Sequence, residues 1–503
     1  MRLLFMCLIL SQFVLTTAHA APEASSETPP KAPETSDAEK IASPVILVAS
    51  VTIDGKKISY RTKAGKLQLK QADGKPTASI FYVSYARTDL PNDDKRPVMF
   101  AFNGGPGSSS VWLHLGVLGP RRIQLPGDGT QPLQPPVQLV ENASSILDEC
   151  DLVFIDPVST GYSRAEKAAK PEDFHQMDGD VESVGDFIRQ WTSENQRWSS
   201  PKFLLGESYG GFRAALLADH LQERYGMSLN GVILMSSLLD FATIQPAYGN
   251  DLSYETFLPS FTSVAHFHGK IHGDRDALVR EAQAFAFGDY AAALLKGNTL
   301  SNEDREKTAA KLAALTGIPA SKWSENQLRI SPMLFRGLLL KDMKKVLGRF
   351  DARVAWDTDD YANDYPNYDP SYSLALGAFS TAMMDYLGRD LGWKEDQPYE
   401  ILTSKVQPWK WDSDNKVVNI SDHLAAAMRD NPKLQVLVMS GRTDLATPPE
   451  GVAHSLRHLL GLSPALQKNF HFTYYEGGHM FYLNPPDLEK SRADLLAFLR
   501  ASR

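Results

Sequence analysis

Three residue types that could form a nucleophilic centre occur in this chain of 503 residues, each in a short motif that follows an apolar run. Ser208 lies in Gly206-Glu-Ser-Tyr-Gly210, which matches the pattern G-x-S-x-G. A serine hydroxyl becomes a nucleophile when an imidazole accepts its proton and a carboxylate orients that imidazole. His479, in Gly-Gly-His-Met, and Asp444, in Ser-Gly-Arg-Thr-Asp, could supply these groups. Together they predict acyl transfer through a covalent intermediate on Ser208.

The apolar runs before these motifs predict the strands of a parallel sheet. Short continuous runs of this kind are typical of strands buried on both faces. They lie at 98–102, 152–155, 203–205, 232–235, 434–439 and 470–475. Helical patterns such as 211–225 and 451–460 lie between them, so we expect helices on both faces of a mostly parallel sheet. The carboxyl ends of such strands form the site, and the chain order serine, aspartate, histidine is that of the α/β-hydrolases.

An acyl-transfer site also needs backbone N–H groups that stabilise the oxyanion. One donor should belong to Tyr209, directly after the nucleophile. The loop Asn103-Gly-Gly-Pro-Gly107 follows the run 98–102 and could supply the other, because its glycines let the backbone approach a substrate. A phosphate-binding loop is the alternative interpretation, but no Gly-Lys-Ser or Gly-Lys-Thr follows.

Four segments together resemble the serine carboxypeptidases, from about Pro97 to the C-terminus. They are Asn103-Gly-Gly-Pro-Gly-Ser-Ser-Ser110, Asp156-Pro-Val-Ser-Thr-Gly-Tyr-Ser163, Gly206-Glu-Ser-Tyr-Gly-Gly211 and Gly478-His-Met480. The resemblance implies an α/β-hydrolase that releases C-terminal amino acids from peptides and uses no metal or cofactor. The absence of a disulfide framework suggests a bacterial branch of the family, since only Cys7 and Cys150 occur.

The same resemblance implies a role for each matching residue. The nucleophile, acid and base would be Ser208, Asp444 and His479, and the oxyanion donors would be the backbones of Gly105 and Tyr209.

Asn103 and Glu207 would bind the terminal carboxylate of the peptide. An ionised carboxyl only accepts hydrogen bonds, so Glu207 could donate to that carboxylate only when protonated, which predicts a preference for acidic pH.

The sequence departs from the family pattern at three places. Val117 stands before Leu-Gly-Pro, where family members commonly have an acidic residue. Phe212-Arg213 replaces an aromatic or histidine pair, and Phe481-Tyr-Leu483 replaces Val-Pro after the histidine motif. Arg213 could compensate with a cation in the site, but a solvent-facing or structural arginine is the favoured interpretation.

Three functions stay open at this stage. An exopeptidase is favoured by the triad with Asn103 and Glu207. A serine esterase or acyltransferase on the same machinery is the alternative, motivated by Val117 and the altered residues after His479. A binding protein with a relic site is disfavoured by the intact triad and oxyanion motifs.

Two clusters of potential metal ligands are interpreted as structural. A metal site at His266, His268 and His272 would need convergent ligands, usually with a carboxylate or cysteine among them, and the predicted mechanism needs no metal. The acidic stretch 357–364 lacks the glycine and terminal glutamate of a calcium-binding loop, so we expect a solvated loop.

The chain divides into four predicted parts. Residues 1–20 have a positive start, an apolar core and a small-residue site, which predicts a signal peptide cleaved after Ala20 rather than a membrane anchor. Residues 21–46 are expected to be a disordered tether. Residues 47–247 with 408–503 would form the hydrolase core, and 248–407, where the alternation of strands and helices stops, would be an inserted helical cap.

Composition limits the partners. The net charge of −8 lacks the basic surface that a nucleic-acid-binding protein needs. The resemblance to the serine carboxypeptidases implies a peptide substrate as the partner. The predicted signal peptide implies no membrane span after its removal and a secreted or periplasmic location. The oligomeric state is left open by the sequence. Cys150, the single cysteine after the predicted cleavage site, is expected to be a buried inert thiol.

Overall fold

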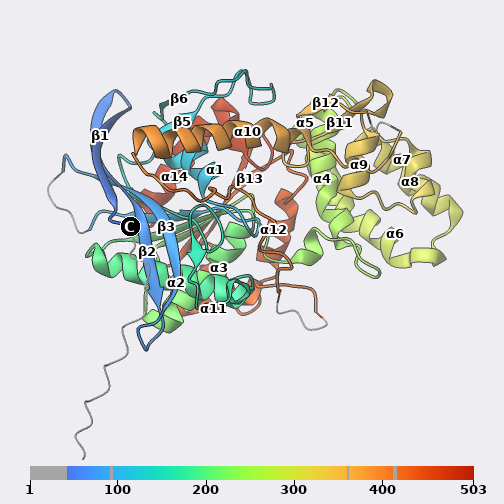
Figure 1. The fold of residues 1–503 in the computed structure, drawn as a ribbon. Helices are drawn as coiled ribbons and strands as arrows, with labels where there is room; N and C mark the ends of the chain where they lie inside the picture. The colour runs from blue at the N-terminus through green and yellow to red at the C-terminus, as the bar shows by residue number, and fades with distance from the viewer. Residues whose placement is uncertain (1–41, 91–94, 360–361, 412–415) are drawn as a thin grey trace, which may run out of the picture. The chain divides into compact units, whose positions relative to one another are not determined.

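A mixed sheet of ten strands forms the centre of the computed structural model, which describes residues 42–90, 95–359, 362–411 and 416–503 (Figure 1). The predicted signal peptide and nearly all of the predicted tether lie outside the described residues. The strand order is β1-β2-β3-β7-β4-β9-β10-β13-β14, with β8 paired to β3. The strands are β1 (Val45–Ile53), β2 (Lys56–Lys70), β3 (Pro76–Arg87), β4 (Val98–Phe102), β7 (Asp151–Ile155), β8 (Arg164–Ala165), β9 (Lys202–Glu207), β10 (Gly231–Met235), β13 (Gln435–Gly441) and β14 (Phe470–Tyr475).

The parallel half of the sheet runs from β7 to β14, and the antiparallel half from β1 to β7. The predicted parallel strands are present, which agrees with the predicted α/β class. β1 begins at Val45, which pairs with Ala64, so the last two residues of the predicted tether belong to the sheet. A separate two-stranded sheet is formed by β5 (Arg121–Ile123) and β6 (Leu139–Glu141).

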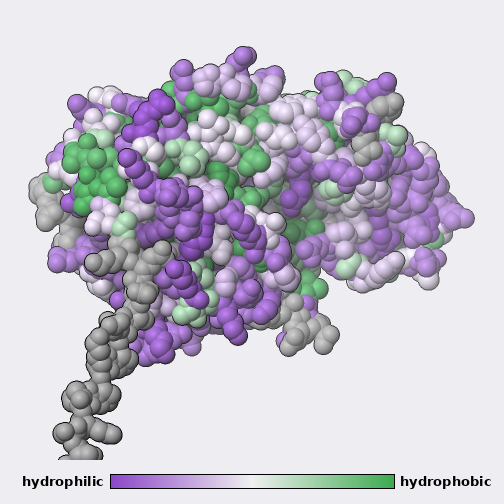
Figure 2. Space-filling view, in the orientation of Figure 1, coloured by the Kyte–Doolittle hydropathy of each residue, from purple (hydrophilic) through white to green (hydrophobic). Residues whose placement is uncertain are grey.

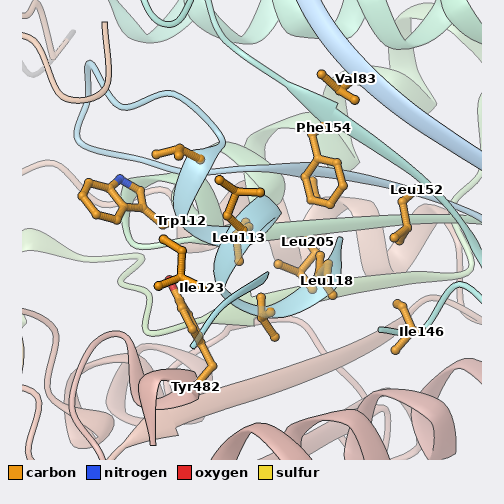
Figure 3. Close-up of a cluster of buried hydrophobic side chains, with 14 of the residues drawn as sticks. Val83, Trp112, Leu113, Leu118, Ile123, Ile146, Leu152, Phe154, Leu205 and Tyr482 are labelled. Atoms are coloured by element: carbon orange, nitrogen blue, oxygen red, sulfur yellow. The ribbon is translucent and has the colours of Figure 1, made fainter. Parts of the chain in front are cut away.

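Helices cover both faces of the sheet because side chains alternate along each buried strand. Phe100, Leu204 and Val232 pack with α2 (Met177–Glu194), α3 (Tyr209–Tyr225), α11 (Ser421–Asp430) and α12 (Pro449–Arg457). Their neighbours Met99 and Leu205 face the other side, with α1 (Val111–Leu113), α10 (Pro370–Asp385) and α14 (Pro485–Ala501). Figure 3 shows part of that second cluster, where Leu113 and Tyr482 lie beside strand residues.

A helical segment lies between β10 and β13 and is drawn in green to yellow in Figure 1. Its elements are α4 (Leu252–Phe267), α5 (Arg275–Phe285), α6 (Ala291–Lys296), α7 (Asn302–Thr316), α8 (Ala320–Glu325), α9 (Pro332–Leu338), β11 (Lys345–Leu347) and β12 (Ala355–Asp357). It has its own hydrophobic cluster, which includes Phe261, Leu312 and Phe335. α10 follows this segment but packs into the cluster on the sheet. The stretch 248–407 thus contributes to two clusters, and its treatment as one cap stays a prediction.

The surface in view is mostly hydrophilic over the helical segment, whereas apolar residues gather over β1 (Figure 2). None of the helices in the described residues is both long and apolar enough to cross a membrane. Cys150 is buried as predicted, and burial raises the pKa of its thiol to about 12.

Candidate active site

Ser208 occupies a sharp turn between β9 and α3. Its backbone has φ 61° and ψ −129°, a combination that strains any residue other than glycine. The turn also needs glycine on both sides. A Cβ on Gly206 would lie 2.0 Å from the carbonyl oxygen of Gly210, and one on Gly210 would lie 2.6 Å from that of Phe102. The G-x-S-x-G motif therefore presents Ser208 at the carboxyl edge of the sheet, as predicted.

His479 and Asp444 meet in a buried pair behind Ser208. The Nδ1 of His479 donates to the Oδ2 of Asp444 at 2.7 Å. The Oδ1 of Asp444 accepts from the backbone N–H groups of Ala446 and Thr447, at 2.7 and 2.9 Å, which holds the carboxylate in place. Burial opposes a charge on His479, but the Asp444 carboxylate outweighs it, and the pKa of the imidazole is raised.

A cavity of about 320 Å³ brings the predicted site residues together. Every predicted site residue except Asp444 lines it, and Asp444 lies behind His479. They are Asn103, Gly105, Glu207, Ser208, Tyr209 and His479.

The glycine-rich loop lies directly against the start of α3. A Cβ on Gly104 would be 2.5 Å from the backbone nitrogens of both Tyr209 and Gly210. Gly105 has φ 103°, a left-handed conformation that favours glycine. N–H groups in the first turn of a helix have no partner within the helix. The structure therefore gathers the main chain of Gly105 and Tyr209 at one wall of the cavity.

Glu207 is a buried carboxyl beside the nucleophile, with 3% of its surface exposed. The hydroxyl of Tyr482 donates to its Oε2 at 2.8 Å, and the side chain of Asn103 is also hydrogen-bonded to it. The Oδ1 of Asn103 accepts from the backbone of Leu113 at 3.1 Å, which leaves its NH₂ group as the donor. Burial raises the pKa of Glu207 to about 7, although His479, Tyr482 and Asn103 act to lower it.

A family model described as serine carboxypeptidase matches residues 54–480. The chain belongs to the serine carboxypeptidase family. Serine carboxypeptidase 24 of Arabidopsis thaliana is 23% identical over 424 residues, which cover 80% of this chain and 78% of that protein. Serine carboxypeptidase-like 13 of the same plant is 29% identical over 167 residues, which cover 32% of this chain and 36% of the relative. The match to serine carboxypeptidase-like 37 likewise spans 38% of that relative's length.

A solved structure shares the fold. A prohormone-processing carboxypeptidase from Saccharomyces cerevisiae, Kex1, aligns with a TM-score of 0.55 at 17% identity. The alignment covers 88% of this chain and 91% of that one. This likeness confirms the predicted α/β-hydrolase fold class.

Two departures of this serine carboxypeptidase-family chain are explained by packing. Val117 is buried in the hydrophobic cluster on the sheet and does not line the cavity. The ring of Tyr482 passes beside the preceding residue, since a Cβ on Gly116 would lie 2.5 Å from it. Tyr482 is thus a partner of Glu207 that the sequence motifs do not predict. Its one signal was its place three residues after His479, in the segment that departs from the family pattern.

Arg213 is structural and does not face the cavity. It is 1% exposed, and its Nε donates to Asp180 at 2.7 Å. Its guanidinium also donates to the carbonyl oxygen of Asn103 at 2.7 Å and lies 5.1 Å from the ring of Tyr209. It therefore holds the main chain beneath the loop, which agrees with the favoured interpretation.

Two histidines of the first cluster of potential metal ligands make separate contacts. His266 and His268 contact the backbone carbonyls of Gly273 and Ala352, at 3.1 and 2.7 Å. In the part of the chain that the structure describes, no group of three or more histidine, cysteine or acidic residues is arranged to hold a metal ion. Asp360 of the acidic stretch lies outside the described residues.

Proposed function

We propose that this chain is a serine carboxypeptidase in activity, and that it releases C-terminal amino acids from peptides through an acyl-enzyme on Ser208. The observation that carries the proposal is the shared cavity. It combines Ser208 and His479 with a buried pair, Asn103 and Glu207, that suits a carboxylate.

The chemistry follows from the direction of His479. Its Nδ1 faces Asp444, so its Nε2 is left to accept the proton of Ser208. The Oγ of Ser208 then bonds to the carbonyl carbon, and the oxyanion is stabilised by the N–H groups of Gly105 and Tyr209. The imidazolium gives its proton to the leaving amine, which departs as the free C-terminal amino acid. Water, activated by the same imidazole, releases the shortened peptide.

The terminal carboxylate of the peptide would lie against Asn103 and Glu207. The side chain of Glu207 donates to that carboxylate only below its pKa, which is about 7. Above that pH two carboxylates would face each other and repel. Free acids should therefore be cleaved best at acidic pH.

The test compares an N-blocked dipeptide as its free acid and as its amide, from about pH 4 to pH 8. We expect the wild-type protein, but not Ser208→Ala, to release the terminal amino acid from the free acid and to cleave the amide much more slowly. Equal rates would contradict carboxylate recognition. Turnover of a simple ester with no release from either peptide would favour the esterase or acyltransferase alternative.

Export remains part of the proposal, supported by the sequence pattern of residues 1–20. Expression with this segment in a bacterial host should yield a mature protein that begins at Ala21 and lies outside the cytoplasm. A full-length N-terminus on the recovered protein would contradict cleavage.

A further inference from the structure

The loop between β11 and β12 reaches the cavity, where Arg349 and Phe350 form part of its wall. Hydrogen bonds to the first residues of α10 and to its N-terminal cap fix the backbone of Arg349 and Phe350. The N–H of Arg349 donates to Asp369 and that of Phe350 to the hydroxyl of Ser371, each at 3.0 Å. The loop is therefore held before any substrate binds.

The same two residues are tied to the triad. The carbonyl oxygen of Arg349 accepts from the N–H of Leu445, which follows Asp444, at 3.1 Å. The carbonyl oxygen of Phe350 accepts from the N–H of His479, and the two rings lie 5.1 Å apart. The position of Arg349 relative to the reacting groups is thus set by main-chain contacts of its loop to His479 and to the residue after Asp444.

The side chain of Arg349, in contrast, has no anionic partner among the described residues. It is exposed, lies 5.3 Å from the ring of Phe350, and forms no ion pair with any carboxylate of the described residues. Arg353, in the same loop, does have an ion-pair partner: it is buried and pairs with Asp351 at 2.7 Å. Burial and the Asp444 carboxylate have the largest effects on the pKa of His479, and the positive charge of Arg349 also acts to lower it.

The rest of the wall leaves this cation available to a ligand. Glu207, the acidic residue of the cavity wall, is buried and already bound by Tyr482 and Asn103. Much of the remaining wall is apolar, for example Trp112 and Leu402. A guanidinium on a fixed loop at the edge of an apolar cavity suits a carboxylate, which it can bind through two parallel hydrogen bonds.

We infer that Arg349 is a specificity residue that binds the side-chain carboxylate of a glutamate or aspartate next to the scissile bond. This inference rests on the proposed function, in which Asn103 and Glu207 already bind the terminal carboxylate. The unpaired charge of Arg349 is then left for a side chain of the peptide.

The kinetic test compares N-blocked Phe-Glu with Phe-Gln, and Glu-Phe with Gln-Phe, near pH 6, where the substrate side chain is ionised. At one of the two positions the wild-type kcat/KM should be about three- to fivefold higher for Glu than for Gln, the size expected of an exposed ion pair. Arg349→Gln should bring that ratio near one, and Arg349→Lys should keep only part of it, because lysine retains the charge but not the two parallel hydrogen bonds. Arg389→Gln is the matched control, because Arg389 is an exposed surface residue that pairs with Asp385. Its ratio should stay at the wild-type value.

A binding measurement separates this inference from the proposed activity. Calorimetric titration of Ser208→Ala with the same peptides needs no turnover. It should show tighter binding of the acidic peptide, with the difference lost in Ser208→Ala/Arg349→Gln.

An unchanged Glu-to-Gln ratio in Arg349→Gln would overturn the inference. So would a loss of discrimination between free acids and amides with the Glu-to-Gln ratio intact, since Arg349 would then bind the terminal carboxylate. If no peptide were cleaved but the binding difference appeared, the proposed activity would fail and the assignment of Arg349 would stand.

Discussion

The hydroxyl of Tyr482 donates a hydrogen bond to the Oε2 of Glu207 at 2.8 Å, across 275 positions of the chain. Both side chains are buried. The contact joins the segment after His479 to the residue before Ser208. Burial raises the pKa of Glu207, whereas His479, the phenol of Tyr482 and Asn103 act to lower it.

Removal of that phenol should move the pH profile. The bond from Tyr482 stabilises ionised Glu207 and so acts to lower its pKa. In Tyr482→Phe the pKa of Glu207 should rise, by up to about one unit for a hydrogen bond of about 1 kcal/mol. The alkaline limb of kcat/KM for a free-acid dipeptide should then shift to higher pH. A lowered rate with an unshifted limb would mean that Tyr482 only fills space.

Glu207→Gln should remove the alkaline limb itself. A glutamine amide donates at every pH and can still accept from Tyr482. Between about pH 6 and pH 8 the wild-type kcat/KM for a free acid should fall by tenfold or more, whereas that of Glu207→Gln should stay nearly flat. The same fall in both proteins would show that another group controls the limb.

The free energy of unfolding should also depend on pH through the titration of Glu207. Burial raises the pKa of Glu207 from its ordinary 4.5 to about 7, so the folded state binds a proton that the unfolded state has lost between these values. This contribution is fully present below about pH 4.5 and is lost as the pH rises through about 7, a change of roughly 3 kcal/mol. Denaturant unfolding of wild type and Glu207→Gln from pH 4.5 to 8 should show a difference that changes in favour of the variant as the pH rises. A constant difference would contradict the shift.

Strain at Ser208 predicts a variant that is inactive but more stable. Because its φ is 61° and its ψ −129°, glycine should relieve the turn that alanine leaves strained. Ser208→Gly should be about 1 kcal/mol more stable than Ser208→Ala by denaturant unfolding, and both should lack peptidase activity. Equal stability would show that the turn is not strained.

The buried pair of Arg213 and Asp180 predicts a structural phenotype. Arg213→Met leaves Asp180 without its ion-pair partner and the carbonyl of Asn103 without a donor, and should destabilise the protein by about 3 kcal/mol. Arg213→Met/Asp180→Asn should recover part of that loss. A variant of wild-type stability whose KM alone rises would instead indicate that Arg213 binds substrate.

The sequence alone was sufficient for the parts of the site that local structure determines. Ser208 needed only the short motif between a strand and a helix, because its geometry depends on residues within the same turn. Asp444 and His479 could be placed because parallel strands end at one edge of the sheet, so residues that follow them converge. The α/β class followed from the spacing of the apolar runs.

Tertiary packing decided the contacts between segments that share no local pattern. The Tyr482–Glu207 bond, the burial of Arg213 under Asn103 and the position of Phe350 beside His479 depend on how loops from distant parts of the chain pack together. Similarly, the sequence pattern predicts that α10 belongs to the inserted cap, but α10 packs on the sheet. The apolar pattern of a helix specifies that one face is buried, but not which of two hydrophobic clusters will bury it.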